Sequence, residues 1–209
     1  MKPIEYFLDA WQRCGELKIL HGYLSNQITA ALSVNELLRA EWVARISAMD
    51  LFVHELVAQN MAEIFQGNRP MCAGFSKFQC SSETIMRIKN AHDPLDAASA
   101  FDLEVRTKLS YCTYQFPDDI ASGFRFFSDK ELWNEIALLR GAPAQAKTSV
   151  AKTIKKELSL IIVRRNKIAH EADLEPIVPR RPWSIERSDV DHVESVVEAL
   201  VRDIDLLAK

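Results

Sequence analysis

The sequence predicts an all-α protein: a largely up-and-down helical bundle that forms one domain with an irregular helical insert. Three observations predict this class. Apolar residues recur at three- and four-residue steps through most of the chain, which is the spacing of one helix face. Polar capping signals and Gly or Pro residues divide that pattern into segments. The chain of 209 residues is 48% hydrophobic and 26% charged, which is enough apolar material for one core.

The first half of the chain should contain two long helices. The first is expected over residues 4–32. Ser33-Val34-Asn35-Glu36 then has the spacing of a capping box, in which the Ser and Glu side chains bond each other's backbone N–H groups. The second helix runs to about residue 66, where Gly67-Asn68-Arg69-Pro70 stops it. Its predicted core stripe is Leu38, Trp42, Ile46, Met49, Val53 and Leu56.

The segment from residue 71 to 127 has a broken pattern, so we expect it to be an insert. Short helices are expected over residues 82–90 and 103–115, separated by Asp93-Pro94 and Phe116-Pro117.

Three further helices are expected after the insert. Ser128-Asp129-Lys130-Glu131 resembles a second capping box and should open a short helix to residue 140. A longer helix is expected over 146–171, and a Pro-rich loop over 176–182. The last helix should cover 188–208, with a stripe of Val190, Val193, Val197, Leu200, Ile204 and Leu207.

Bulk properties narrow the class of protein. The net charge of −3 argues against a general nucleic-acid-binding protein. No apolar run approaches the length of a membrane span, and the first residues lack the apolar core of a signal peptide. The four cysteines do not have the spacing of a disulfide framework or a zinc site. We therefore expect a cytoplasmic protein with reduced thiols, no membrane contact, no metal site and no cofactor.

The most informative segment lies late in the 146–171 helix, where Arg165, Asn166 and His170 stand within six residues. Such a set suits chemistry on a phosphodiester. Arg can neutralise the charge of a phosphorane, His can move protons near neutral pH, and Asn can orient either side chain. A basic run from Lys147 to Lys167, opposed only by Glu157, leads into the set. This run is either a solvated helix face or a phosphate track for RNA; its members are Lys147, Lys152, Lys155, Lys156, Arg164, Arg165 and Lys167.

The string Arg165-Asn166-x-x-x-His170 resembles the R-x4-6-H motif of the HEPN superfamily. The earlier stretch Arg45-Ile46-Ser47-Ala48-Met49-Asp50-Leu51, with His54, is most similar to the RiboL-PSP-HEPN group. This resemblance implies a single HEPN-type helical domain over residues 1–209. It also implies a metal-independent ribonuclease that works as a homodimer. A role as a toxin or in phage defence, with an antitoxin or another defence protein as partner, is a further implication.

The spacing of Arg165 and His170 poses a geometric problem. On a straight helix, the two positions lie about 140° apart and do not share a face. Two arrangements could bring them together: the helix ends or distorts near His170, or a two-fold axis places a second chain's motif beside the first. Each residue also has a purely structural interpretation. Arg165 could be a core-facing Arg paired with a carboxylate, and His170 could favour the negative end of the helix dipole.

Four other side chains could support the site. Arg164 could take over the phosphate contact from Arg165. Arg45 lies within the apolar stripe of its helix and should need an acidic partner. Asp50 and His54, at i and i+4, could line the cleft, with Asp50 orienting Arg165 or His170, or they could form an ordinary salt bridge. His21, His92 and His192 have no suggestive neighbours in the sequence.

Two functional hypotheses follow. In the first, the chain is an endoribonuclease: His170 moves the proton of the RNA 2′-hydroxyl or of the leaving 5′-oxygen, Arg165 stabilises the phosphorane and Asn166 holds the geometry. In the second, it is a non-catalytic HEPN module that binds RNA or a protein partner through the same groove.

Overall fold

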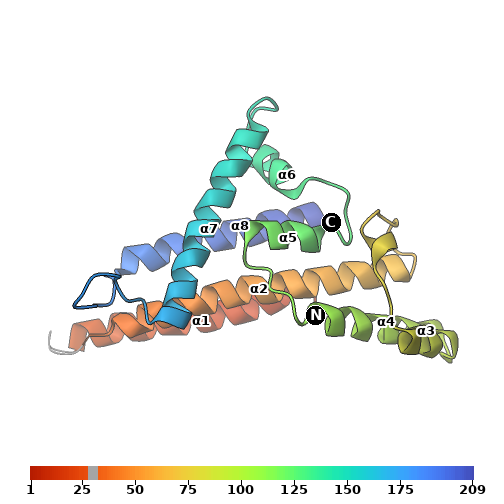
Figure 1. Ribbon diagram of the computed structural model, residues 1–209, viewed down its shortest axis with the longest axis horizontal. Helices are drawn as coiled ribbons and strands as arrows, with labels where there is room; N and C mark the ends of the chain where they lie inside the picture. The colour runs from red at the N-terminus through yellow and green to blue at the C-terminus, as the bar shows by residue number, and fades with distance from the viewer. Residues whose placement is uncertain (28–32) are drawn as a thin grey trace.

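A computed structural model describes residues 1–27 and 33–209. Within these ranges the chain forms eight α-helices, one short 3-10 helix and no strand, so the predicted all-α class is confirmed (Figure 1). The helices are α1 (Pro3–Gln27), α2 (Asn35–Phe65), η1 (Phe75–Lys77), α3 (Ser82–Lys89), α4 (Pro94–Leu109), α5 (Pro117–Phe124), α6 (Leu132–Leu139), α7 (Lys147–Glu171) and α8 (Arg187–Ala208). None of the described helices is both long enough and apolar enough to cross a bilayer.

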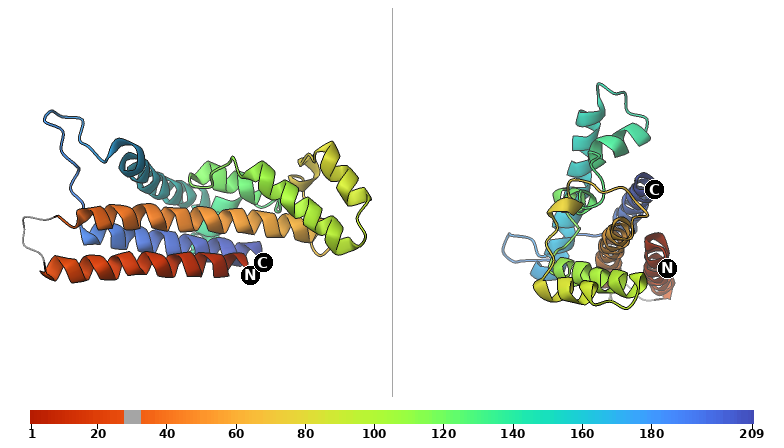
Figure 2. Two further views of the ribbon diagram at one scale, coloured as in Figure 1. Left: turned by 90° about the horizontal axis from the view of Figure 1, so that it is seen from below. Right: turned by 90° about the vertical axis from the view of Figure 1, so that its right-hand side faces the viewer.

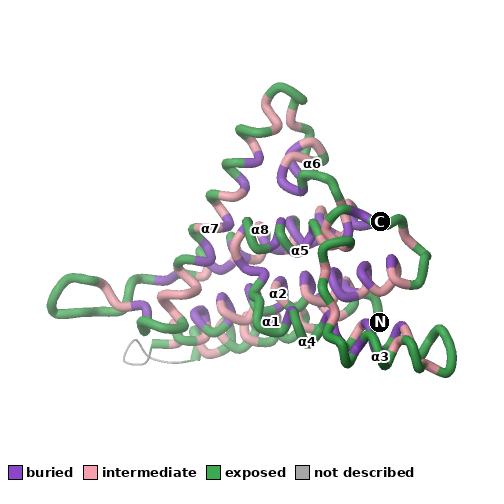
Figure 3. Tube along the Cα trace, turned by 45° about the vertical axis from the view of Figure 1, so that its right-hand side comes forward, coloured by how far each residue is buried: buried purple, intermediate pink, exposed green. Residues whose placement is uncertain are grey.

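Three long helices, α1, α2 and α8, lie side by side, and the two chain ends lie near each other at one end of this layer (Figure 2). Buried residues recur along most of the length of α2 (Figure 3). All six residues of the predicted α2 stripe are buried, as are the predicted α8 residues except the half-buried Leu207. The core therefore forms where the 3.6-residue periodicity placed it.

Helix α7 crosses both α2 and α8 at a steep angle, and its first turns project beyond the three-helix layer, where α6 packs against it (Figure 1). The crossing is fixed by Trp42 of α2, whose indole Nε1 donates to the carbonyl of Ile161 at 3.2 Å. Leu158 and Ile162 of α7 are fully buried. The predicted helix 146–171 is thus confirmed to within one residue.

The predicted helix over residues 82–90 is confirmed by α3, but the second helix of the insert begins at Pro94 rather than at residue 103. Asp93-Pro94 lies between α3 and α4, as predicted, but it also starts α4: the Asp93 side chain accepts from the N–H of Asp96, and Pro94 occupies the first turn. Pro117 likewise opens α5. Proline is tolerated there because first-turn N–H groups have no partner within the helix. The predicted end of the 103–115 helix is therefore wrong, since α4 ends at Leu109.

Neither predicted capping box forms as a reciprocal pair, although the helices that they announced exist. Ser33 and Ser128 each accept a backbone N–H two residues further on, from Asn35 and from Lys130, both at 3.3 Å. Helix α2 begins at Asn35 without a side-chain cap, and Glu36 contacts Arg39 instead. Helix α6 begins at Leu132, also without a side-chain cap. The predicted end of the first helix at residue 32 lies outside the described residues. A reciprocal capping box does open α8, where Glu186 and Asp189 bond each other's backbone N–H groups.

An ion cluster centred on the buried Arg45 joins α1, α2 and α8. Arg45, fully buried on α2, donates to Glu41 at 2.7 Å and lies 3.0 Å from Glu194 of α8. Its guanidinium also lies 4.4 Å from the ring centre of Trp11 on α1. Lys18 of α1 completes the cluster by contacting Glu194. Arg45 thus has the acidic partner that its position in the apolar stripe required.

Candidate functional site

Helix α7 continues without a break through His170 and Glu171. It ends where Ala172 and Asp173 both adopt positive φ angles, of 52° and 55°. The N–H groups of these two residues donate to the carbonyl of Lys167, which satisfies an acceptor that the last turn would otherwise leave free. The helix therefore ends after the Arg165–His170 segment and leaves the helical geometry of that segment intact.

Asp173 anchors this helix end to the rest of the fold. Its side chain is fully buried, and its Oδ2 accepts from Arg39 of α2 at 3.0 Å and from Arg164 at 2.7 Å. The two arginines also bond the next loop, since Arg39 donates to the carbonyl of Trp183 and Arg164 to that of Ser184. One carboxylate thus ties α2, α7 and the segment before α8 together, and Arg164 has a structural role.

The sequence analysis missed Asp173. A signal was available, because two arginines on helical positions need a carboxylate if they are buried. Asp173 lies just beyond the helix, at a position where Asp and Asn tolerate positive φ better than most residues. Neither fact is enough to identify Asp173 from the sequence, because its partner Arg39 lies 134 residues earlier in the chain.

Arg165 has a different environment from Arg164. It is half-buried, and its Nη1 donates to the Oδ1 of Asn166 at 3.1 Å. In the described part of the chain no carboxylate lies within ion-pair distance of it. Its Nε is buried without a hydrogen-bond partner there. The structural interpretation, in which Arg165 is a core Arg paired with an acid, is therefore not supported, because no acidic partner is found among the described residues.

His170 is exposed in the last turn of α7. Because the helix is regular up to Glu171, Arg165 and His170 stay about 140° apart around its axis and about 7.5 Å apart along it. Distortion of the helix does not bring the two side chains to one face. Of the two arrangements considered above, a distorted helix is not what the structure has, and the pairing of two chains stays a prediction.

Asp50 and His54 belong to another cluster. Asp50 accepts from the backbone N–H of Tyr114 at 2.6 Å and from the side-chain amide of Gln115 at 3.0 Å. The His54 Nε2 lies 3.6 Å from Asp50, and its ring packs edge-on against Tyr114. Burial raises the pKa of the Tyr114 hydroxyl. Asp50 and His54 therefore hold the segment between α4 and α5.

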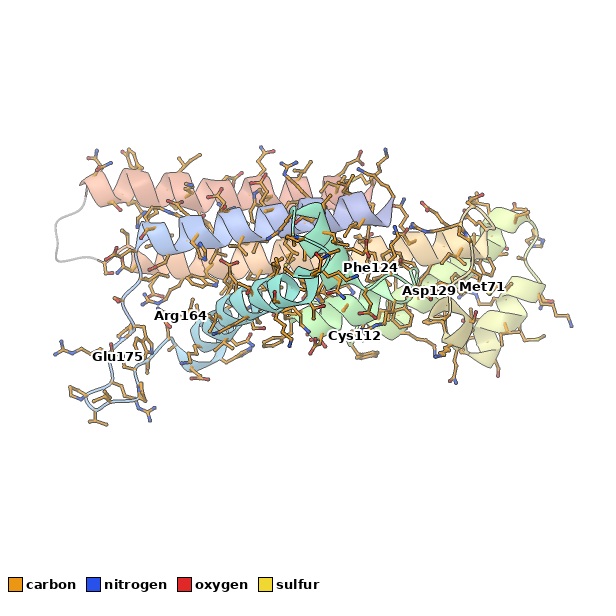
Figure 4. All side chains as sticks on the ribbon, turned by 90° about the horizontal axis from the view of Figure 1, so that it is seen from above. Met71, Cys112, Phe124, Asp129, Arg164 and Glu175 are labelled. Carbon is orange, nitrogen blue, oxygen red and sulfur yellow. The ribbon has the colours of Figure 1, made fainter. Side chains whose placement is uncertain are left out.

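No hydrogen bond or ion pair joins Asp50 or His54 to Arg165, Asn166 or His170 among the described residues. Cys112 precedes the Tyr114 segment, and Figure 4 shows it well separated from Arg164 along the long axis of the molecule. The structure thus assigns Asp50 partners other than the side chains it was expected to orient.

The lysines of the predicted RNA track fall on more than one side of α7. At 100° per residue, Lys152, Lys156, Lys167 and His170 lie within a sector of about 60°, which we call the basic face. Two exposed apolar side chains lie beside these charges: Val163, 45% exposed, is within the sector, and Leu160, 61% exposed, is about 20° beyond its edge. A charged surface with exposed apolar side chains between the charges can contact both phosphates and bases.

Two other lysines of the run do not belong to the basic face. Lys155 is turned towards α5, where its Nζ lies 2.6 Å from Asp118. Lys147 starts the helix on the side of Arg165, about 34 Å of helix rise from His170. Lys167, at the other end, lies 5.8 Å from the ring centre of Trp183.

Groups of three or more His, Cys, Asp or Glu side chains that could hold a metal ion do not occur in residues 1–27 and 33–209. All four cysteines are free thiols. Comparison of the chain with protein-family models, with curated proteins and with solved structures finds no match. The candidate site therefore has to be argued from the geometry of its own side chains, without a related protein for comparison.

Proposed function

We propose that the protein is an endoribonuclease whose site is completed by a second copy of the chain. The observation that carries the proposal is the contrast between three neighbouring arginines. Arg39 and Arg164 are committed to Asp173, whereas Arg165 has a single side-chain hydrogen bond, to Asn166, and no carboxylate partner among the described residues. A guanidinium that is not neutralised from within the chain is suited to a phosphate.

The chemistry assigns one role to each side chain. The RNA 2′-hydroxyl attacks the adjacent phosphorus, the P–O5′ bond breaks, and the products are a 2′,3′-cyclic phosphate and a 5′-hydroxyl. His170, exposed and free to meet substrate, takes the proton of the 2′-hydroxyl or gives one to the leaving oxygen. Arg165 offsets the negative charge of the phosphorane, and the 3.1 Å bond to Asn166 orients its guanidinium.

The second copy supplies what one chain lacks. A two-fold axis near the end of α7 would place His170 of one chain beside Arg165 of the other and would form two such sites at once. The basic face would then lead the strand towards each site. The proposed partners are accordingly RNA and a second copy, with a toxin or phage-defence role as the biological setting that the HEPN resemblance suggests.

A direct test is cleavage of mixed RNA by the purified protein in EDTA, beside Arg165→Ala and His170→Ala. The proposal requires cleavage by the parent, a cyclic phosphate on the 5′ product, and loss of cleavage in both variants. Proton transfer alone contributes roughly a hundred- to ten-thousandfold in rate.

The non-catalytic alternative is favoured by one observation, the 140° separation on an unbroken helix. It would take the place of the ribonuclease proposal if the parent bound RNA without cutting it.

A further inference from the structure

A cavity of about 470 Å³ lies between α7 and α8, with α2 as its floor. Its size is within the roughly 300–1,000 Å³ range of small-ligand sites. Helix α7 supplies most of the lining, α8 supplies one residue and α2 one residue. The lining residues are Trp42, Thr153, Lys156, Glu157, Leu160, Ile161 and His192.

The apolar part of the cavity suits a flat ring. Trp42 is held in place by its indole bond to the Ile161 carbonyl and forms a rigid floor. Leu160, 61% exposed, lines the cavity and borders the basic face. The cavity therefore opens directly beside the surface proposed to bind RNA.

The polar part consists of three charged or titratable groups. The Nε2 of His192 on α8 lies 3.3 Å from the Oε1 of Glu157 on α7, so this pair links the two helices that line the cavity. The Oε2 of Glu157 has no hydrogen-bond or ion-pair partner in the described part of the chain. Lys156 brings a positive charge to the same cavity and is a member of the basic face. His192, which had no suggestive neighbours in the sequence, thus gains a partner in Glu157.

We propose that this cavity binds one nucleobase of the RNA strand that lies along the basic face, and that it selects guanine. The inference rests on the proposed ribonuclease function and deepens it. Guanine carries its N1–H and N2 amino donors side by side, so both can reach one carboxylate. Adenine and cytosine place an amino donor beside an acceptor, and uracil has one N–H between two carbonyls. Glu157 is the acceptor, and Lys156 contacts a phosphate.

Recognition and cleavage are thereby separated along one helix. Glu157 lies about 20 Å of helix rise from His170. The bound base thus belongs to a nucleotide away from the cleaved bond, and the cavity sets sequence preference without touching the reacting atoms.

The test is equilibrium binding of GMP, AMP, CMP and UMP by titration calorimetry. A bidentate contact of this kind predicts about tenfold or greater preference for GMP. Glu157→Gln should abolish that preference, because the amide replaces one acceptor with a donor. The Glu157 side chain is 40% exposed, so the variant should fold as the parent does. Glu198→Gln, on α8 beside Arg202 and outside the cavity, is the matched control and should retain the preference.

Equal affinity for the four nucleotides, or unchanged GMP preference in Glu157→Gln, would overturn the proposal. Mapping cut sites then tests the strand itself: the parent should show a guanine at a fixed offset from each cut, and that guanine should be lost from the cuts that Glu157→Gln still makes. Cut sites with no such guanine would also overturn it. If the parent cuts no RNA, the proposed function fails, whereas the nucleotide titration still decides whether the cavity binds guanine.

Discussion

Arg164 and Asp173 are joined across the end of α7 by a contact of 2.7 Å between Nη2 and Oδ2. The next residue, Arg165, has no carboxylate partner in the described ranges. Two adjacent arginines thus have different roles. Arg164 holds the helix end to a buried acid, whereas the guanidinium of Arg165 is not neutralised by any residue that the structure describes.

This contrast predicts opposite effects for two adjacent substitutions. Arg164→Ala should lower the free energy of unfolding by about 1–3 kcal/mol, because Asp173 would lose one of its two charged partners while staying buried. Arg165→Ala should cost about 1 kcal/mol or less and should abolish RNA cleavage. Urea denaturation and a cleavage assay on the same preparations measure both. A larger stability loss for Arg165→Ala than for Arg164→Ala would return Arg165 to a structural role.

Asp173→Asn isolates the charge of the anchor. Asn tolerates the positive φ of 55° at this position, so the backbone can stay as it is while Arg39 and Arg164 lose their counter-ion. Loss of one partner from a buried ion pair costs about 3–5 kcal/mol, and a loss of this size is expected in urea denaturation. Glu175→Gln, two residues later in the loop, should stay within about 0.5 kcal/mol. Equal stability of the two variants would show that Asp173 is not the anchor.

The basic face predicts which lysines set RNA affinity. Replacing Lys152, Lys156 and Lys167 by Glu should weaken binding of a single strand and reduce the slope of log K against log salt by about two, at roughly 0.7 per phosphate contact. A matched double variant, Lys147→Glu with Lys155→Glu, changes charges outside that face. It should leave the slope nearly unchanged. Similar slopes for both variants would mean that the face does not guide RNA.

A pH-dependent prediction comes from the contact of α1 with α8. The Lys18 ammonium, 2.8 Å from Asp191, lowers the pKa of that carboxyl from its ordinary 3.8. A carboxyl whose pKa falls on folding stabilises the native state above its unfolded pKa and loses that effect as the pH drops through the folded value. Asp191→Asn should therefore lower Tm at pH 7 and leave it close to the parent's near pH 2.

Asp9→Asn, in an exposed pair with Arg13 on α1, serves as its control and should change Tm little at either pH. A Tm difference for Asp191→Asn that persisted unchanged at low pH would rule out the ionic origin.

The long helices could be predicted from the sequence because their stabilisation is periodic and local. Leu38, Ile46 and Val197 are buried where a 3.6-residue stripe placed them. The first residues of α4 and α5 could not be predicted in the same way, because Pro94 and Pro117 are compatible both with a break between helices and with a first helical turn. Distinguishing the two requires the tertiary contacts that bury α4 and α5.

The candidate site was predictable in part. The Arg165-Asn166-His170 string could be identified from residue chemistry alone, and the 140° separation followed from helix geometry. The sequence could not predict that Arg164, and not Arg165, pairs with an acid, because that pairing depends on how Asp173 folds back towards α7. The pairing of Glu157 with His192 likewise depends on how two helices cross.

The central claim is that one chain supplies Arg165 and a second supplies His170, and subunit mixing tests it most directly. Arg165→Ala and His170→Ala, each inactive alone, are mixed, dissociated and reassociated, and RNA cleavage is measured in EDTA. In a mixed two-fold dimer one of the two sites holds an intact Arg165 and an intact His170, so random mixing should restore about a quarter of the parental rate. Mixed dimers confirmed by mass that cut no RNA, or variants that are active on their own, would contradict the composite site.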